Sequence, residues 1–600
     1  MAAAEYLSAL HTRLSGHLSA SQTPLEFLRS EAQMDGSAVW LLSAGGKNVD
    51  ILRTLRKAIQ TEPAQIAVFC ATHGSPLAKR AAPLAIDVLE YEPPAGKDGF
   101  LATNSLATFL LLIARAYSEA TRAPFADSVS ELLASVVPEF CDLAKLRDGL
   151  APLFDREHWL VLCDPACRSI AWDIESRFSE AALGSVKVCD LRNFAHGRHH
   201  WIAKRASTSA VIVLSQPGTA KLAMKSLALL PRSLPRIHVP FSDDPILAPV
   251  GGILLSMRIA GWAGEMCGID PGRPGVPEFG RRLYSLSTKP TLDSKLPSIK
   301  RFVARKAGLT TASLGAAGLE GVWETSLEEF RQGLYQNVIR AIVFDYDGTL
   351  VEVVDRFYPP KPDVSTALIQ LLTSGIWLGI ATGRGRSARR DLQKVIPAEH
   401  WARVLVGYHN GAELGYLDDQ TVPDSSQGTL DPVIAKSLDL LQAHPTIWQH
   451  LSVKPSHSQL GLQWKASILG WSLINLLEPI LPTLCNLGIH LVTSGHSVDL
   501  LAPGVSKRKV ITRLAGDAAI PVSGVLVIGD RGRPPGNDAE MLSHRPSLSV
   551  DEVSRESSTC WRLTPPMLKG TAATLWYLSR LSMRKRSPRA VSFRKGSLDK

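Results

Sequence analysis

Long apolar runs, paired cysteines and a large excess of one charge are all missing from this 600-residue sequence. No stretch of 18 apolar residues occurs, so we expect no membrane span. The most apolar candidate, residues 100–117, is interrupted by polar side chains and predicts a buried helix. The first ten residues lack the charged-then-apolar order of a secretory signal. The composition, 45% hydrophobic and 20% charged residues, is typical of a globular protein. At roughly 150 residues per domain, the length predicts about three or four domains.

The eight cysteines are scattered, and only Cys163 and Cys167 lie close together in the sequence. No second pair completes a zinc site, and buried free thiols are common in globular cores. A disulfide scaffold is therefore excluded, and we expect reduced thiols in a cytoplasmic protein.

Positive charge is concentrated at one end of the chain. The net charge is +10, and residues 581–600 hold seven Lys or Arg against one acid. The remainder is nearly balanced, which argues against a nucleic-acid-binding protein, apart from weak contacts by this tail. Because the tail is rich in Arg, Lys and Ser and poor in aliphatic side chains, we expect it to be disordered.

Short apolar strands alternate with helical stretches along the whole chain, a pattern typical of α/β units with parallel sheets. Nearly all of these strands are followed by Gly, Ser, Thr or Asp. Ligands of open α/β sheets bind at the carboxyl ends of the strands, so these residues are the first candidates for chemistry.

The most specific motif is AIVFDYDGTLV at residues 341–351. A buried strand delivers Asp345 and Asp347 to a turn that Gly348 permits. At this spacing Asp345 can attack a phosphorus atom while Asp347 handles the proton of the leaving group. The motif resembles that of the haloacid dehalogenase (HAD) superfamily of aspartate-nucleophile phosphohydrolases.

Further motifs of that superfamily follow in order: IATGR at 380–384, GVSKRKVITRL at 504–514 and VLVIGD at 525–530. The resemblance implies that Thr382 holds the transferring phosphoryl group. It also implies that Lys507 offsets charge between the nucleophile and the phosphate. The implied cofactor is Mg²⁺, with carboxylate ligands from Asp345, Asp347, Asp530 and Asp538.

The loop after the last of these motifs is longer than in many relatives. Six residues separate Asp530 from Asn537, a spacing similar to that of phosphomannomutases of the same superfamily. We therefore expect Asp538 to be a functional carboxylate despite the longer loop. Arg531 and Arg533 in this loop either face the substrate or lie in solvent, and the sequence leaves both alternatives open.

The interval of 125 residues from Thr382 to Lys507 leaves room for a second small α/β domain. HNGAELGYL at 409–417 and HSVDLLAPGVSK at 496–507 are similar to the edges of a C2-type cap, as in sugar phosphatases such as sucrose-phosphate phosphatase. By this resemblance the cap would choose the substrate.

In the N-terminal half, the strand ends carry the loops CATHGS and SQPGT. This half resembles the sugar isomerase (SIS) fold, present as two tandem units in the isomerase half of glucosamine-6-phosphate synthase. The resemblance implies a phosphosugar held by hydroxyls and helix N-termini. The candidate ligands are Ser43, Thr72, Ser75, Ser215 and Thr219. Each of these hydroxyls could equally be a helix cap.

The second of these units also carries candidates for isomerase chemistry. DIESRFSEAALG places Glu180, and NFAHGRHHW places His196, where the SIS isomerases have a catalytic Glu and a His. A carboxylate can shuttle a proton between sugar carbons and a His can open the ring. The family's C-terminal Lys is replaced by Phe279, so phosphosugar binding is better supported than isomerisation.

These features predict an α/β chain, in which a double SIS module precedes a Rossmann-like HAD core with an inserted α/β cap. The expected boundaries are 1–145 and 146–290 for the two SIS-like units, 291–335 for a linker, 336–407 with 501–580 for the core, 408–500 for the cap and 581–600 for the tail. The expected function is a Mg²⁺-dependent phosphatase that acts on a phosphorylated sugar or sugar derivative through an aspartyl-phosphate. Two alternatives stay open: the SIS module is a phosphosugar sensor that regulates the phosphatase, or the phosphatase acts on a nucleotide in signalling or defence. By analogy, the SIS module would also support a homodimer.

Overall fold

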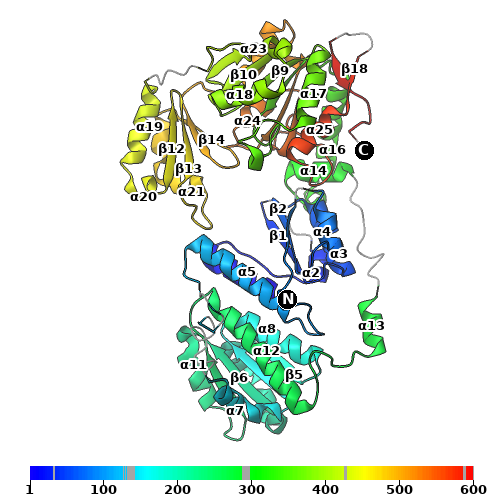
Figure 1. Ribbon diagram of the computed structural model, residues 1–600, viewed down its shortest axis with the longest axis vertical. Helices are drawn as coiled ribbons and strands as arrows, with labels where there is room; N and C mark the ends of the chain where they lie inside the picture. The colour runs from blue at the N-terminus through cyan, green and yellow to red at the C-terminus, as the bar shows by residue number, and fades with distance from the viewer. Residues whose placement is uncertain are drawn as a thin grey trace.

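The protein is α/β throughout, as the sequence predicts (Figure 1). The computed structural model describes residues 1–30, 34, 36–84, 86–125, 128, 130–131, 142–286, 298–423, 429–584 and 589–598. Figure 1 shows the first N-terminal unit lying between the second unit and the C-terminal half.

The first unit is built on a parallel sheet whose strands follow one another in chain order. Its elements are α2 (Pro24–Arg29), β1 (Ala38–Ser43), α3 (Val49–Thr61), β2 (Gln65–Cys70), α4 (Pro76–Ala81) and β3 (Asp87–Glu90). Leu41, Leu55, Ile66 and Val68 form part of its small core. The sheet is parallel because each helix returns the chain to the same starting edge.

The second unit has a four-stranded parallel sheet of order β5-β4-β6-β7. Its central strand, β6, is buried along its whole length, as expected for a strand covered on both faces. The elements are α7 (Leu143–Phe154), β4 (His158–Cys163), α8 (Arg168–Glu180), β5 (Ser185–Asp190), α10 (His200–Arg205), β6 (Ser209–Ser215), α11 (Pro217–Ala228), β7 (Arg236–Pro240), α12 (Leu247–Cys267) and α13 (Glu278–Tyr284).

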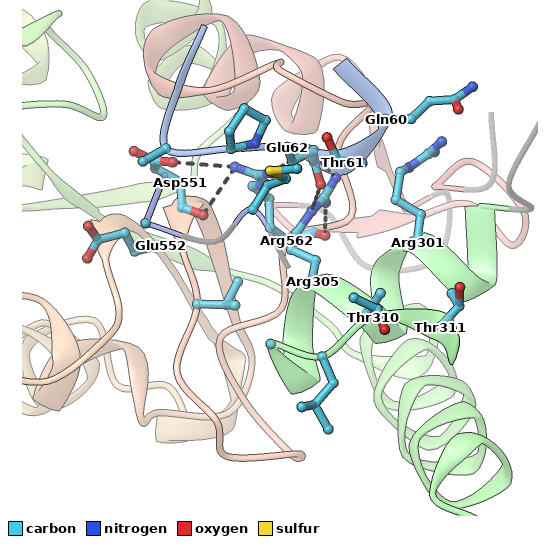
Figure 2. A pocket seen from close by; sticks show the side chains of 18 of the residues that line it. Gln60, Thr61, Glu62, Arg301, Arg305, Thr310, Thr311, Asp551, Glu552 and Arg562 are labelled. Atoms are coloured by element: carbon cyan, nitrogen blue, oxygen red, sulfur yellow. Dashed lines mark hydrogen bonds and ion pairs between the residues drawn. The ribbon is translucent and has the colours of Figure 1, made fainter. Parts of the chain in front are cut away.

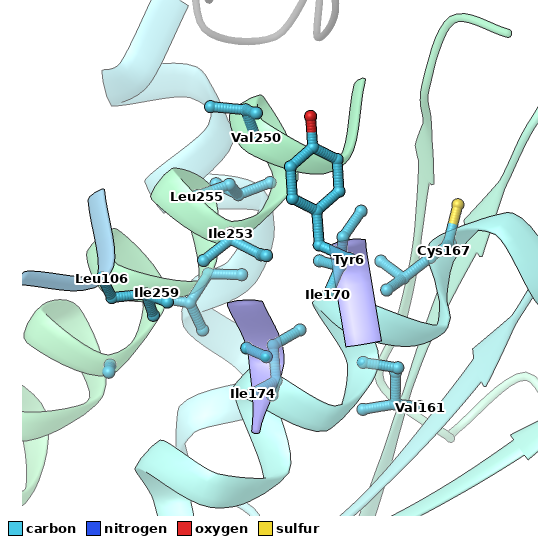
Figure 3. Close-up of a cluster of buried hydrophobic side chains, with 14 of the residues drawn as sticks. Tyr6, Leu106, Val161, Cys167, Ile170, Ile174, Val250, Ile253, Leu255 and Ile259 are labelled. Atoms are coloured by element: carbon cyan, nitrogen blue, oxygen red, sulfur yellow. The ribbon is translucent and has the colours of Figure 1, made fainter. Parts of the chain in front are cut away.

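Two helices from the segment expected to form the first unit join the core of the second. Helices α1 (Ala2–Ser15) and α5 (Asn104–Thr121) contribute Tyr6 and Leu106 to the cluster around α8 and α12 (Figure 3). The Tyr6 hydroxyl donates to the carbonyl of Ile246 at 2.7 Å. The division at residue 145 is therefore not a division between cores.

Helix α12 crosses this cluster. Among the described residues it is the one helix whose length and composition would suffice to span a membrane, and 72% of that apolar window is buried inside the protein. Ile253 and Ile259 illustrate this burial in Figure 3.

The C-terminal half contains a six-stranded sheet of order β11-β10-β9-β8-β16-β17, parallel except for β11. Its strands are β8 (Ala341–Asp345), β9 (Trp377–Ala381), β10 (Val404–Tyr408), β11 (Glu413–Tyr416), β16 (Val525–Arg531) and β17 (Ser547–Glu552). Its helices are α17 (Pro362–Thr373), α18 (Arg386–Val395), α23 (Lys509–Asp517), α24 (Ala539–Leu542) and α25 (Gly570–Leu578).

A separate antiparallel sheet of order β12-β13-β15-β14 forms the inserted domain, with its own hydrophobic cluster. Its elements are α19 (Pro432–Gln442), α20 (Pro445–Trp448), β12 (Leu451–Ser456), β13 (Gln459–Trp464), α21 (Leu473–Leu477), α22 (Leu481–Asn486), β14 (His490–Thr493) and β15 (Val498–Leu501). The expected cap boundary at residue 408 is too early, because β11 pairs with β10 in the core sheet.

The segment expected to be a linker is part of the C-terminal core. Within the described residues it forms α14 (Ser298–Ala307), α15 (Thr311–Ala316) and α16 (Glu320–Gln336). Phe302, Leu314 and Leu327 are buried in the same cluster as the core strands. The polar overall composition of this segment predicts a linker. Each helix buries only one apolar face, so the rest of its surface can be polar.

The expectation of a disordered tail at 581–600 is wrong for its described residues. Strands β18 (Leu581–Met583) and β19 (Val591–Phe593) pair with each other, and Val591 also bridges to Ile339. Phe593 and Leu598 are 2% and 1% exposed. A few apolar side chains thus anchor the described part of the tail to the core; residues 585–588 and 599–600 lie outside the described part.

Candidate active site

Three carboxylates meet at the carboxyl edge of the C-terminal sheet. Asp345 ends β8, Asp530 lies near the end of β16 and Asp538 caps the start of α24. One oxygen from each lies within 4.8 Å of the others, and all three residues are buried. Neighbouring parallel strands end at the same edge of a sheet, which is why residues almost 200 positions apart converge here.

A buried lysine holds two of these carboxylates. Lys507 Nζ lies 2.5 Å from Asp345 Oδ1 and 2.7 Å from Asp538 Oδ1. Burial, reinforced by the charge of Asp538, raises the pKa of Asp345 to about 8 despite the lysine. Burial and Asp345 raise the pKa of Asp530 as well. The cluster therefore carries more negative charge than one ammonium group can stabilise.

The surplus negative charge fits a divalent cation. Asp345 Oδ2 is buried and has no hydrogen-bond partner among the described residues. A buried carboxylate oxygen without a partner is costly, and three hard oxygen donors at this spacing suit Mg²⁺. The donor set thus fits the predicted cofactor. The side chain of Asp347, also predicted as a ligand, lies outside this group of three.

The turn after β8 requires a glycine. Gly348 has φ +88, and a Cβ atom at this position would lie 2.2 Å from Asp530 Oδ2. The motif thereby lets the nucleophile loop approach the β16 carboxylate.

Asp347 is held by an arginine that the sequence analysis did not single out. Arg384 Nε donates to Asp347 Oδ2 at 2.9 Å, and the second guanidinium nitrogen contacts Oδ1. Thr382 is 1% exposed, and its hydroxyl accepts from the Arg384 amide at 3.1 Å. Arg384 lies two residues after Thr382 in IATGR, so its place in the motif could have identified it.

A cavity of about 210 Å³ opens between this edge and the inserted domain. Asp345, Asp347, Arg384 and Asp530 line it on the core side. The inserted domain contributes polar side chains that sequence reasoning missed: Lys454, Gln459, Gln463, Ser494, His496, Ser497 and Asp499. The inserted domain, called the cap below, therefore lines one side of the candidate active site.

The cap is joined to the core by side-chain hydrogen bonds. Asn410 Nδ2 donates to Gln459 Oε1 at 2.9 Å and to Asp499 Oδ2 at 3.2 Å. Burial, followed by the positive charge of Arg356, lowers the pKa of His496 to about 4, so this imidazole is neutral at pH 7. The cap face is thus a hydrogen-bonding surface with few charges.

The long loop between Asp530 and Asp538 also links core and cap. Asp538 Oδ2 accepts from the amides of Asp530 and Arg531 at 3.0 and 3.2 Å. The Thr493 amide of the cap donates to the Pro535 carbonyl at 2.7 Å. The loop between Asp530 and Asp538 therefore fixes the position of Asp538 next to the cap. Arg531, in the same loop, lines the cavity.

The predicted phosphosugar hydroxyls of the N-terminal half have partners inside the protein. Ser43 accepts from the Gly46 amide and Thr72 donates to the Ala44 carbonyl, each at 3.1 Å. Ser75 caps α4, Ser215 lies 2.7 Å from His238 Nε2, and Thr219 donates to Asp164 Oδ2 at 2.7 Å. These bonds support the helix-cap alternative, and the Asp164 carboxylate opposes a phosphate beside Thr219.

Glu180 and His196 are not brought together. Glu180 ends α8, just before β5 begins at Ser185, whereas His196 follows the end of β5 at Asp190. A six-residue strand is about 17 Å long, so the two exposed side chains lie at opposite edges of the sheet. The 16-residue spacing matches the SIS motif, but the direction of the strand separates the residues.

No family model and no curated protein match this chain. Among solved structures it is similar to the C-terminal domain of a Francisella tularensis glucosamine-fructose-6-phosphate aminotransferase (14% identity, 45% of this chain and 82% of that one, TM-score 0.35). It is also similar to tagatose-6-phosphate ketose/aldose isomerase from Escherichia coli (14% identity, 46% of this chain and 82% of that one, TM-score 0.36). A third similar structure is a HAD-superfamily phosphatase from Bacteroides thetaiotaomicron (20% identity, 35% of this chain and 83% of that one, TM-score 0.27). At these identities and TM-scores, the likenesses do not decide the function.

Proposed function

We propose that the protein is a Mg²⁺-dependent phosphomonoester hydrolase of the HAD type. The observation that carries this proposal is the buried group of Asp345, Asp530, Asp538 and Lys507, with one oxygen of Asp345 left without a partner. Perturbed carboxylates in a cavity are the usual sign of a catalytic site.

The residues divide the reaction between them. Asp345 attacks phosphorus, the bond from phosphorus to the ester oxygen breaks, and Asp347 donates a proton to the departing oxygen. Water then attacks the aspartyl-phosphate at phosphorus, Asp347 accepts its proton, and inorganic phosphate leaves. Lys507 orients Asp345 and favours its ionised form against the effect of burial. Mg²⁺ held by Asp345, Asp530 and Asp538 would offset the charge of the phosphoryl group.

The cavity favours a small, hydroxyl-rich substrate. About 210 Å³ is below the roughly 300–1,000 Å³ of pockets for drug-sized ligands. The amides of Gln459 and Gln463 and the neutral His496 suit sugar hydroxyls better than a nucleobase, which needs a flat apolar surface. A phosphorylated sugar or sugar derivative is the substrate class that we propose.

A screen of phosphate esters with purified protein and Mg²⁺ tests this function. We expect phosphate release from hexose, pentose or amino-sugar phosphates, silenced by EDTA and restored by Mg²⁺. Failure on every sugar phosphate together with turnover of nucleotides would replace the proposed substrate class. Failure on all esters would contradict the phosphatase proposal itself.

For the N-terminal half we propose a regulatory role rather than isomerisation. Glu62 of this half contacts Arg305 and Arg562 of the phosphatase half, which gives a route for communication between them. We expect no exchange of a carbon-bound sugar proton with deuterium from solvent, because Glu180 and His196 lie at opposite ends of β5 within one chain. Robust exchange by the wild-type protein would restore the isomerase alternative.

A further inference from the structure

A second, larger cavity lies between the N-terminal half and the phosphatase core (Figure 2). Its volume is about 620 Å³. One wall comes from the end of α3 and the residues after it, including Gln60, Thr61 and Glu62. The opposite wall comes from α14 and α15, with Arg301 and Thr310, and from the loops that follow β16 and β17.

Positive charge dominates this lining. Seven basic side chains face three acidic ones, an excess of four. The basic residues are Lys57, Arg301, Arg305, Arg531, Arg533, Arg562 and Lys569, and the acidic ones are Glu62, Asp551 and Glu552. Low-dielectric walls concentrate the field of such a group, so the cavity attracts anions.

One carboxylate serves two buried guanidinium groups. Glu62 Oε2 lies 2.7 Å from Arg305 Nε, and Glu62 Oε1 lies 2.5 Å from a terminal nitrogen of Arg562. Burial and repulsion by Arg562 lower the pKa of Arg305 to about 10. Burial would raise the pKa of Glu62, but the two arginines lower it to about 2. Glu62 alone therefore does not neutralise these two buried arginines.

The other two acids are also engaged. Asp551 Oδ1 pairs with Lys569 Nζ at 2.8 Å and with Arg562 at 3.4 Å, while Glu552 Oε1 lies 2.5 Å from Arg531. Arg301 has no carboxylate partner among the described residues, and its buried Nε has no hydrogen bond. Figure 2 shows the Arg301 side chain beside Gln60, on the side of the cavity opposite Asp551.

We propose that this interdomain cavity binds a small molecule that carries two or more phosphate groups. Lys57 and Arg301 line the cavity without an ion pair among the described residues, which suits a ligand with more than one anionic group, and the volume lies within the range of small-ligand sites. The hydroxyls of Thr61, Thr310 and Thr311 line the same space and can donate to phosphate oxygens. Such a ligand contacts both halves and holds them together. The proposal goes beyond the phosphatase reaction and does not depend on it.

Arg301 is the residue that separates this site from the active site. Arg531 lines both cavities, so a change there would alter both. Arg301 lines only the interdomain cavity, whereas Arg384 lines only the catalytic one. Lys300 precedes Arg301 on the same helix but pairs with Glu320 at 2.7 Å, and it provides a control for loss of one positive charge.

Calorimetric titration of the full chain with inorganic pyrophosphate, without Mg²⁺, tests the proposal. Arg301→Ala should weaken binding by about 10-fold or more, because a charge-assisted contact is lost. Lys300→Ala and Arg384→Ala should leave the Kd within about twofold. Inorganic phosphate should bind more weakly than pyrophosphate. Lys57→Ala is a second variant, should Arg301→Ala not fold.

Three outcomes would overturn the proposal. The first is no pyrophosphate binding at millimolar concentration, and the second is an unchanged Kd in folded Arg301→Ala and Lys57→Ala. The third is loss of binding in Arg384→Ala alone, which would place the anion in the catalytic cavity. None of these measurements requires turnover, so failure here and failure of the phosphatase proposal are distinguishable.

Discussion

The carboxyl edges of two parallel sheets in this protein use their polar side chains in opposite ways. At the edge of the C-terminal sheet, Asp345 and Lys507 are buried with charges that the protein only partly neutralises. At the edges of the N-terminal sheets, Thr219 and Ser75 are satisfied by neighbouring groups. Native proteins pair almost all buried polar groups, so the unsatisfied edge is the one that points to chemistry.

Apart from loss of the nucleophile itself, removal of the proton-transfer group should have the largest effect on activity. Asp347→Asn should lower kcat by about 10²–10⁴-fold, since an amide cannot exchange the proton. Stability should fall as well, because Asp347 is only 20% exposed and the amide loses the ion pair with Arg384, so kcat is measured per folded molecule. Asp363→Asn, an exposed change on α17, is the control. A loss of less than about tenfold would contradict the role of Asp347.

Removal of a buried cation should destabilise either half, but only one of the two changes should affect catalysis. Lys507→Met leaves Asp345 and Asp538 unpaired, and Arg177→Met leaves Asp173 without its partner at 2.6 Å. Each should cost about 3–5 kcal/mol of unfolding free energy in urea titrations. The rate per folded molecule should fall in Lys507→Met alone. Equal rates in both variants would remove the functional distinction.

The basic tail, residues 581–600, tests whether a segment away from both sheet edges packs against the core. Phe593→Ala should cost about 3 kcal/mol or more, because the ring is buried in the core of the C-terminal half. Met583→Ala, on the paired strand and 48% exposed, is the matched control and should change stability by less than about 1 kcal/mol. Equal melting temperatures for wild type and Phe593→Ala would support the original expectation of disorder.

The smallest effect is expected in the N-terminal loops. Thr219→Val should cost about 1 kcal/mol, the usual worth of the hydrogen bond that Thr219 donates to Asp164. Measurement of both stability and phosphosugar affinity is decisive here. Unchanged stability with a more than tenfold loss of affinity would show that Thr219 binds ligand instead of bracing the loop.

The sequence predicted best where one short motif follows a buried strand. Asp345 and Gly348 were identified because strand, turn and carboxylates are contiguous. The joint role predicted for Glu180 and His196 is not supported within one chain, since a spacing does not reveal that α8 returns the chain to the opposite edge. Ile339 pairs with Val591, about 250 residues later in the chain. The amino-acid composition of the tail does not predict such a long-range contact.

The interior of the catalytic cavity was only partly predictable. Arg384 is part of a recognised motif and was within reach. Gln459 and His496 come from a domain whose strands had to be placed before any residue could face the core. The N-terminal contact made by Glu62 has no sequence signal, because its partners Arg305 and Arg562 lie hundreds of residues away.

Trapping of the covalent intermediate tests the central claim most directly. Protein mixed with ³²P-labelled substrate and Mg²⁺, then quenched in acid, should carry an acyl-phosphate on the peptide that contains Asp345. Asp345→Asn should show neither this label nor phosphate release. Label on a different residue, or near-normal turnover by Asp345→Asn, would contradict the assignment of Asp345 as the nucleophile.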